Sequence, residues 1–531
     1  MIPSLITVFA IAAAAAPGAP LATPPLSPSG PSAATVQVEN GTTPTSVPAE
    51  TAKATSELFD PFDTAGRFTF GSYGRINAFA TPDWHPISQP TDVTRPMSVV
   101  TFGPRLDETP YQELDFHFRL LKRPDEEGPK TNVVFTLALA ENYFQYTGQF
   151  AANWAVRNLF VESQDVGVPH LTAWIGSRMY RGDDVYLFDF WPLDNLNTYG
   201  AGLGYQLPWG DLAIHMGVNQ LADPYQVQLV EVANPGFGTS DIPFNNRLRR
   251  VESFKLTVPL PFSKTADPWA NARYKIRIYG ELHQLNAGQL LTDPQAAPPL
   301  PQTTYLPPDN GALLGAELGA WKFGRNAYAN LWIRYAQGLA TYGDLGLPGS
   351  ADISNQSSSA QQWLGALAGN YELGRFGALW GLYAQSFRDS AAFSGPAGAE
   401  GVGSYSTGSY DEFAASIRPS WFVTHTFHLD VEASQQVRFP HSLSPYSAAY
   451  QTPAVTKLTI MPLLSPLGIG SLTRPQLRFL CTVAFLNEGA REQLYSQAVI
   501  GGAPADPRFG QPIQTYCGVD AEWWFNSSYG G

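Results

Sequence analysis

A two-residue alternation of apolar and polar side chains recurs along most of this 531-residue chain. In segment 111–121 (YQELDFHFRLL), odd positions carry Tyr, Glu, Asp, His and Arg, whereas positions 114, 116, 118 and 120 carry Leu or Phe. Segments 67–78, 132–142 and 274–282 repeat the pattern. Because successive side chains of a β-strand point to opposite faces, these segments are predicted to be strands with one apolar and one polar face.

The composition indicates where the two faces lie. Charged residues make up only 15% of the chain and aromatic residues 13%, whereas a soluble domain usually carries about 25% charge. No run of 18 apolar residues follows the N-terminal leader, so no membrane-spanning helix is expected. These features favour an all-β transmembrane antiparallel barrel, with lipid outside and a water-filled lumen inside. The alternative is a large secreted β-sandwich or propeller.

The N-terminus has the pattern of an export signal. Residues 2–16 are apolar and are followed by small residues and proline, although no Lys or Arg precedes Lys53. This run is too short for a transmembrane helix but suits a secretory signal. We therefore predict a signal peptide over 1–16, a Pro/Ala/Ser/Thr-rich disordered periplasmic linker over 17–65, and a barrel domain over 66–531.

Several classes of function lack support in the sequence. The charge of 32 − 45 = −13 and the pI near 5.1 disfavour nucleic-acid binding. Two cysteines exclude a disulfide-rich scaffold and a cysteine-based zinc cluster. The sequence contains no nucleophile elbow, phosphate loop or dinucleotide fingerprint. We therefore expect that the protein is not an enzyme and that it binds no cofactor and no metal.

The segment 174–205 (WIGSRMYRGDDVYLFDFWPLDNLNTYGAGLGY) resembles the most recognisable stretch of the maltoporins, the LamB-type carbohydrate porins. Five further segments resemble that family in the same order along the chain. They are 70–75 (FGSYGR), 105–114 (RLDETPYQEL), 416–421 (SIRPSW), 473–478 (TRPQLR) and 521–525 (AEWWF). Together they cover about 68–525, with a looser match over 220–400.

The resemblance implies an 18-stranded antiparallel barrel with an inward-folded constriction loop. It also implies a homotrimer in the outer membrane of a Gram-negative bacterium, which passes maltose- or maltodextrin-like oligosaccharides by facilitated diffusion. The length allows this, because 531 − 65 = 466 residues leave about 26 per strand and connection, and a strand needs about 9–11 to cross the bilayer.

A sugar channel of this kind needs two sets of side chains. Aromatic faces stack on the apolar faces of sugar rings, while charged groups exchange hydrogen bonds with the hydroxyls. Each site must bind weakly enough to release the chain to the next. The resemblance assigns the aromatic slide to Tyr73, Tyr111 and Trp524, the polar track to Arg75, Arg105, Glu113, Arg157, Asp184 and Asp189, and the constriction to Trp191.

Alternatives remain open for these residues and for the function. One alternative for the aromatic residues is that they belong to an interfacial aromatic girdle. The alternative for the charged residues is that water solvates them in the lumen and they do not touch sugar. The chain has Gly182 and Leu472 where the family has Arg and Trp. The function is alternatively that of a general or anion-tolerant diffusion porin, or of a secreted carbohydrate-binding protein or glycoside hydrolase.

The two cysteines are predicted to form a disulfide between strands. Cys481 shares its alternation face with Phe479, and Cys517 shares its face with Val519, so both point outward. The sum 481 + 517 = 998 nearly equals that of the strand ends, 487 + 512 = 999, which places the cysteines almost opposite in a symmetric hairpin. An exported chain meets an oxidising periplasm, and a bridge needs Cα atoms about 4.4–6.8 Å apart. The alternative is two free thiols against lipid.

Overall fold

The computed structural model describes residues 68–82, 84, 86–87, 98–121, 129–140, 148, 153–234, 236–260, 273–291, 303–346, 356–390, 408–441, 450–493 and 511–529. The predicted signal peptide and linker, 1–16 and 17–65, lie outside the described residues. Among the described residues there is no helix long and apolar enough to cross a membrane.

Eighteen antiparallel strands form one closed wall. They are β1 (Phe68–Ala80), β3 (Tyr111–Leu121), β4 (Lys130–Ala140), β5 (Asn153–Gln164), β6 (Leu171–Arg181), β7 (Asn195–Leu207), β8 (Gly210–Asn219), β11 (Arg249–Leu260), β12 (Tyr274–Leu285), β15 (Asp309–Trp321), β16 (Arg325–Gly338), β17 (Gln361–Leu373), β18 (Phe376–Arg388), β19 (Tyr410–Phe422), β20 (Phe427–Pro440), β21 (Ala454–Leu464), β22 (Gln476–Leu486) and β23 (Ile513–Tyr529).

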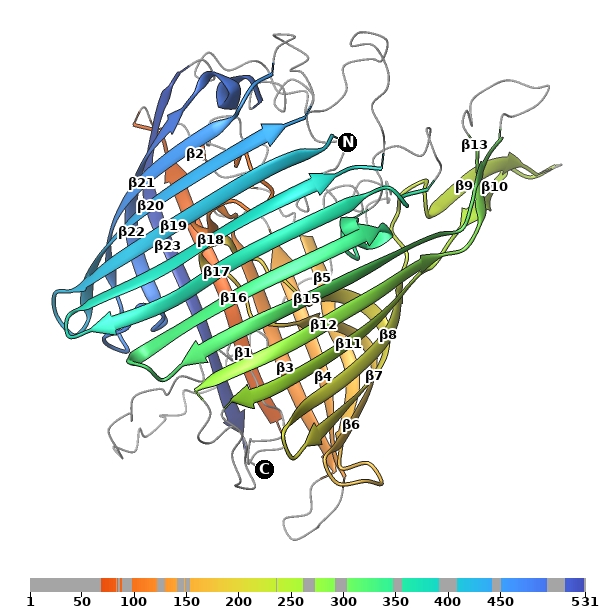
Figure 1. Cartoon of the computed structure of the whole chain (residues 1–531), viewed down its shortest axis with the longest axis horizontal. Helices are drawn as coiled ribbons and strands as arrows, with labels where there is room; N and C mark the ends of the chain where they lie inside the picture. The colour runs from red at the N-terminus through yellow and green to blue at the C-terminus, as the bar shows by residue number, and fades with distance from the viewer. Residues whose placement is uncertain are drawn as a thin grey trace, which may run out of the picture.

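Smaller elements lie in the connections. The short strands are β2 (Pro86–Ile87), β9 (Val227–Ala233), β10 (Thr239–Asn246), β13 (Gly288–Leu291) and β14 (Thr303–Leu306), and the 3₁₀ turns are η2 (Arg105–Asp107), η3 (Tyr186–Phe188) and η4 (Leu339–Tyr342). The β9–β10 and β13–β14 hairpins are joined by Gln228, which exchanges two hydrogen bonds with the backbone of Leu291. In Figure 1, β9, β10 and β13 extend beyond the rim of the barrel.

The first and last wall strands close the barrel. β1 pairs along its whole length with β23, from Phe68 opposite Tyr529 to Ala80 opposite Cys517. β23 continues past Phe525 to Tyr529. These last residues extend the terminal strand beyond the aromatic motif at 521–525, which is unusual. The predicted 18-stranded antiparallel barrel is therefore confirmed.

The alternation in the sequence corresponds to the two faces of the wall. On β3 the odd-numbered positions, including Glu113 and Asp115, are turned inward and become buried, whereas Phe118 and Leu120 are exposed on the outside. β5 departs from strict alternation because a bulge opposite Thr136 and Leu137 places Arg157 and Asn158 side by side on the strand. A bulge adds one unpaired residue and so resets which positions face inward.

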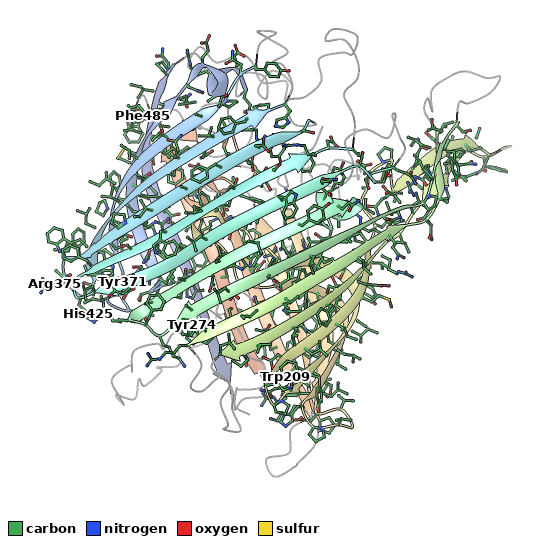
Figure 2. All side chains as sticks on the ribbon, viewed as in Figure 1. Trp209, Tyr274, Tyr371, Arg375, His425 and Phe485 are labelled. Carbon is green, nitrogen blue, oxygen red and sulfur yellow. A yellow bond between two sulfur atoms is a disulfide. The ribbon has the colours of Figure 1, made fainter. Side chains whose placement is uncertain are left out.

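The two ends of the barrel differ in their connections. Short turns such as 208–209, 322–324 and 374–375 lie at one end, and longer connections such as 182–194 and 220–248 lie at the other. Trp209, Tyr274 and Tyr371 lie along the short-turn end of the outer wall, where Figure 2 labels them. These exposed rings are placed as an interfacial aromatic girdle would be.

The cysteines occupy opposite positions on β22 and β23. The register pairs Cys481 with Cys517, their Cα atoms are 4.1 Å apart, and the sulfur atoms are bonded. Phe479 and Phe485 on β22 and Val519 on β23 are exposed on the same outer face. The bridge predicted from the sequence is thus present, between strands joined by the long connection 487–512.

Candidate functional site

Residues 182–194, which connect β6 to β7, fold into the barrel and are called the inward loop below. The loop makes one tight reversal, in which Val185 N–H donates to Phe190 C=O at 2.8 Å and Asp189 adopts a left-handed φ of 47°. Leu187 and Phe188 at the centre of the reversal are buried. The inward-folded loop predicted from the sequence is therefore present.

Both ends of the inward loop are attached to the barrel wall by charge. Asp183 accepts a hydrogen bond from Arg277 Nη1 at 2.7 Å and also contacts Lys275, both on β12. At the other end, Asp194 pairs with Lys255 on β11 at 3.0 Å. Charge-assisted contacts of this kind fix position as well as contributing energy.

A second inward segment, 98–107, fills the lumen beside the first. Phe102 stacks on Phe190 of the inward loop with ring centroids 4.3 Å apart and planes inclined by 8°. Thr101 N–H donates to Glu412 on β19 at 3.1 Å, and Phe102 N–H donates to the Tyr383 hydroxyl on β18 at 3.0 Å. These contacts place the two segments against the inner face of β18–β20.

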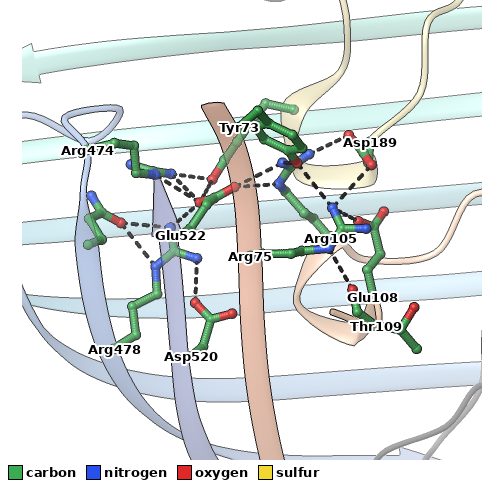
Figure 3. Close-up of polar contacts among 12 residues, drawn as sticks. Tyr73, Arg75, Arg105, Glu108, Thr109, Asp189, Arg474, Arg478, Asp520 and Glu522 are labelled. Carbon is green, nitrogen blue, oxygen red and sulfur yellow. Dashed lines mark hydrogen bonds and ion pairs between the residues drawn. The ribbon is translucent and has the colours of Figure 1, made fainter. Parts of the chain in front are cut away.

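Glu522 of β23 is the centre of a buried polar cluster (Figure 3). It accepts hydrogen bonds from Arg105 Nε at 2.9 Å and from Arg474 Nε at 2.8 Å, and it contacts Arg478. Tyr186 of the inward loop adds a hydroxyl donor at 2.7 Å. Three guanidinium groups around one carboxylate need this dense pairing, because a buried charge without a partner is costly.

Asp189 and Glu108 extend this cluster toward the lumen. Arg105 and Arg75 both contact Asp189, and Arg75 also pairs with Glu108. Burial by itself would raise the pKa of Asp189, but Arg105 and Arg75 lower it to about 2. Burial raises the pKa of Glu108 to about 8 even though Arg75 opposes the shift. Two carboxyl groups a few ångströms apart therefore differ in charge near neutral pH.

The three predicted slide rings lie on neighbouring strands and are partly exposed. Tyr73 on β1 is opposite Trp524 on β23 in the strand register, and Tyr73 and Tyr111 on β3 have ring centroids 6.2 Å apart. Guanidinium groups lie over two of the faces, with Arg474 at 4.4 Å from the Trp524 centroid and Arg105 at 5.6 Å from that of Tyr73.

The other predicted residues fall into two groups. Arg157 and Glu113 approach to 3.9 Å on the inner wall, and Trp191 lies on the inward loop with Arg181 at 3.9 Å from its ring centroid. Asp184, by contrast, is buried within the inward loop, whereas Asp189 is partly exposed.

Sequence reasoning did not single out Asp183, Tyr186, Glu108, Arg474 or Arg478. Alternation alone places Glu522 and Asp520 on the inner face of the last strand, which is the available signal. Arg478 donates to Asp520 at 3.0 Å, and 478 + 520 = 998 is the same sum as for the two cysteines, so hairpin symmetry is a signal for this pair as well. No spacing rule in the chain links either strand to its partners on the inward loop. Such partners become visible only once strands far apart in the sequence are placed side by side.

A closed barrel with an apolar outside, a charged inside and loops folded into the lumen defines an outer-membrane channel of the porin class. The profile of the LamB porin family matches residues 68–525. The chain therefore belongs to the LamB porin family and is a protein of the Gram-negative outer membrane. This result replaces the alternative of a secreted sandwich or hydrolase.

Solved structures of other outer-membrane proteins resemble the chain weakly. OpdK (OccK1) of Pseudomonas aeruginosa has a TM-score of 0.41 and 10% identity, covering 87% of this chain and 99% of that one. OccAB4 of Acinetobacter baumannii has a TM-score of 0.39 and 8% identity, covering 88% and 100%. OmpT of Vibrio cholerae has 0.34 and 9%, covering 87% and 99%. No curated protein matches the sequence.

Proposed function

We propose that the channel conducts oligosaccharides by facilitated diffusion along Tyr111, Tyr73 and Trp524. The observation that carries this proposal is the placement of three partly exposed rings on the adjacent strands β3, β1 and β23, facing the lumen. Sugar rings offer apolar faces to such rings, and the nearby arginines and carboxylates offer partners to the hydroxyls.

The number of rings in the aromatic slide affects which sugars the channel can bind. Leu472, where the family has a tryptophan, packs beside Trp524 against the buried cluster of Tyr186, Leu187 and Leu379. An aliphatic side chain fills that space without offering a ring face. We therefore propose a slide shorter than that of the maltoporins, and we propose oligosaccharides as the substrate class without restricting it to maltodextrins.

A general diffusion channel is the second candidate. The observation that favours it is the guanidinium group on the faces of Trp524 and Tyr73, since a covered face is less available for a sugar ring. Small solutes would then pass by size and charge alone.

Sugar block of the ion current through single channels distinguishes the two. We predict that Trp524→Ala and Tyr111→Ala each weaken block by a linear oligosaccharide by about 1 kcal/mol, or roughly five-fold in Kd. Small-ion conductance should stay equal or rise. Phe525→Ala is the matched control, because Phe525 is the next residue of β23 but lies on the exposed outer face instead of facing the lumen. Unchanged block in both lumen variants would assign the rings to a structural function.

Three further features belong to the proposal. We propose a homotrimeric assembly, removal of the signal peptide 1–16, and a periplasmic linker over 17–65. The mass of the mature N-terminal peptide after export tests the cleavage, and native mass spectrometry tests the assembly.

A further inference from the structure

Bases and acids on the inner wall differ in how far they reach into the lumen. Along the wall from β5 to β11 the base is the more exposed partner of each ion pair. The Arg178 side chain is 24% exposed and that of Glu162 is 9%, while Lys255 is 20% exposed and Asp194 is 1%. The cause is geometric, since a carboxylate on a short stem stays near the backbone whereas the long stems of Arg and Lys carry their charge outward.

Two more arginines on this wall have mainly neutral partners. Arg157 Nε donates to the sulfur of Met179 at 2.9 Å, while its separation from Glu113 is 3.9 Å. Arg181 Nε donates to the amide oxygen of Asn195 at 3.0 Å. The Arg157–Glu113 ion pair is long and Arg181 is held by a neutral amide, so much of the positive charge of the two guanidinium groups acts on the lumen.

The more exposed acids lie on or next to the inward segments, while Glu113 on β3 is 11% exposed. The side chains of Asp189 and Glu108 are 22% and 20% exposed, and each already contacts Arg75. Glu522 and Glu317 on the wall strands are 1% and 0% exposed. The chain has a net charge of −13, yet the water-exposed surface of this part of the lumen is positive.

Aromatic rings lie within the same positive patch. Arg181 lies over Trp191 at 3.9 Å from the ring centroid, and Lys255 lies over Tyr180 at 4.3 Å. A ligand that carries carboxylates matches the positive charge, because a guanidinium group binds a carboxylate through two parallel hydrogen bonds. The ring faces covered by Arg181 and Lys255 are not available for stacking, so the sugar rings of such a ligand would stack on the slide of the proposed function. We infer that the preferred substrate is an acidic oligosaccharide, a sugar chain whose rings carry carboxylates. This inference rests on the proposed function and specifies its substrate class.

The test compares three probes on the reconstituted full-length channel in planar bilayers. They are trigalacturonate, neutral maltotriose, and the sugar-free tricarboxylate tricarballylate. We expect trigalacturonate to block the current at least about ten-fold more tightly than either of the others at 0.1 M salt, and the advantage to shrink at 1 M salt. Under a potassium chloride gradient, the reversal potential should have the sign of a channel that passes chloride more readily than potassium.

Two variants locate the effect. Arg181→Gln should reduce the advantage of trigalacturonate over maltotriose several-fold, and it is expected to fold because its hydrogen-bond partner is an amide. Arg250→Gln is the matched control, since Arg250 is exposed near the rim of β11 and pairs with Glu252 rather than with any residue of the patch. It should leave the advantage unchanged.

The outcomes separate this inference from the proposed function. Equal block by trigalacturonate and maltotriose, or tighter block by maltotriose, overturns the acidic substrate while leaving a sugar channel. Block by tricarballylate as tight as that by trigalacturonate overturns the requirement for sugar rings. The absence of block by either saccharide overturns the proposed function itself.

Discussion

Charged residues in this barrel are controlled by burial and by neighbours on distant segments. Glu522 is held by Arg105 from the segment 98–107 and by Arg474 ahead of β22, so one carboxylate joins three parts of the chain. Burial also changes the charge of Glu108, because it raises the pKa of this carboxyl group to about 8 against the opposing effect of Arg75. A carboxyl group of this kind is neutral below pH 8 and gains a negative charge above it.

We therefore predict that the selectivity for anions over cations falls as the pH rises through 8. One unit charge about 4 Å from the ion path in water is worth about 1 kcal/mol, or roughly five-fold in the permeability ratio. Reversal potentials measured between pH 6 and 9 check this change. Glu108→Gln should remove the part of the pH dependence that is centred near pH 8 while keeping the selectivity measured at pH 6. A wild-type channel with the same ratio at pH 6 and 9 would contradict the assignment.

Among the elements, the β22–β23 hairpin depends most on correct register. Its strands are joined by residues 487–512, and a long connection fixes register weakly. A slip of one residue would turn Asp520 and Glu522 toward lipid and bring Val519 and Trp523 inside. The bridge between Cys481 and Cys517 prevents this slip because it fixes one opposed pair of residues.

Loss of the bridge should destabilise the barrel. With the cysteines 36 positions apart in the sequence, the chain-entropy estimate is about 3–4 kcal/mol. We predict that Cys481→Ser/Cys517→Ser lowers the urea midpoint of unfolding in lipid vesicles, and that reductant lowers the midpoint of the wild type but not of the variant. Thiol labelling of the denatured, unreduced protein should find no reactive thiol, and two reactive thiols per chain would disprove the bridge.

On the scale of the whole molecule, the outer wall is not uniform. Trp209, Tyr274 and Tyr371 mark the short-turn end on one side. The described outward-facing residues of β1 and β3 include neither Trp nor Tyr. They include phenylalanines that pack on one another, such as Phe70 and Phe116, whose ring centroids are 5.3 Å apart. An apolar hollow of about 680 Å³ crosses β1 and β20–β23 on the same side. Such a wall suits contact with another subunit better than contact with lipid headgroups.

We predict that this wall is shielded from lipid in the proposed homotrimer. Ile76 on β1 and Ile278 on β12 are a matched pair, because both face outward and are 41% and 43% exposed in the single chain. A fluorophore on Ile278→Cys should be quenched strongly by brominated lipid, and one on Ile76→Cys should be quenched weakly. Equal quenching at the two positions would show that the β1 wall faces lipid.

Much of the architecture could be predicted from the chain alone. The alternation seen at Glu113 and Phe118 determines which face of a strand is polar, and it depends only on the two-residue period of a β-strand. The opposition of Cys481 and Cys517 follows from hairpin symmetry. Tyr73, Tyr111 and Trp524 were assigned from motifs and lie on the inner wall, although their contact with sugar stays a prediction.

The tertiary structure alone decided which charges meet and which of them reach water. Asp183 contacts Lys275 and Arg277 across more than 90 residues of sequence, and Tyr186 reaches Glu522 across the lumen. The bulge at Arg157 changed the inward set of β5. Closure of the barrel and folding of two segments into it set these partners, and long-range contacts of this kind have no local period or spacing. The sequence therefore determined the wall and its two faces, whereas the packing of loops against that wall determined the charge of the lumen.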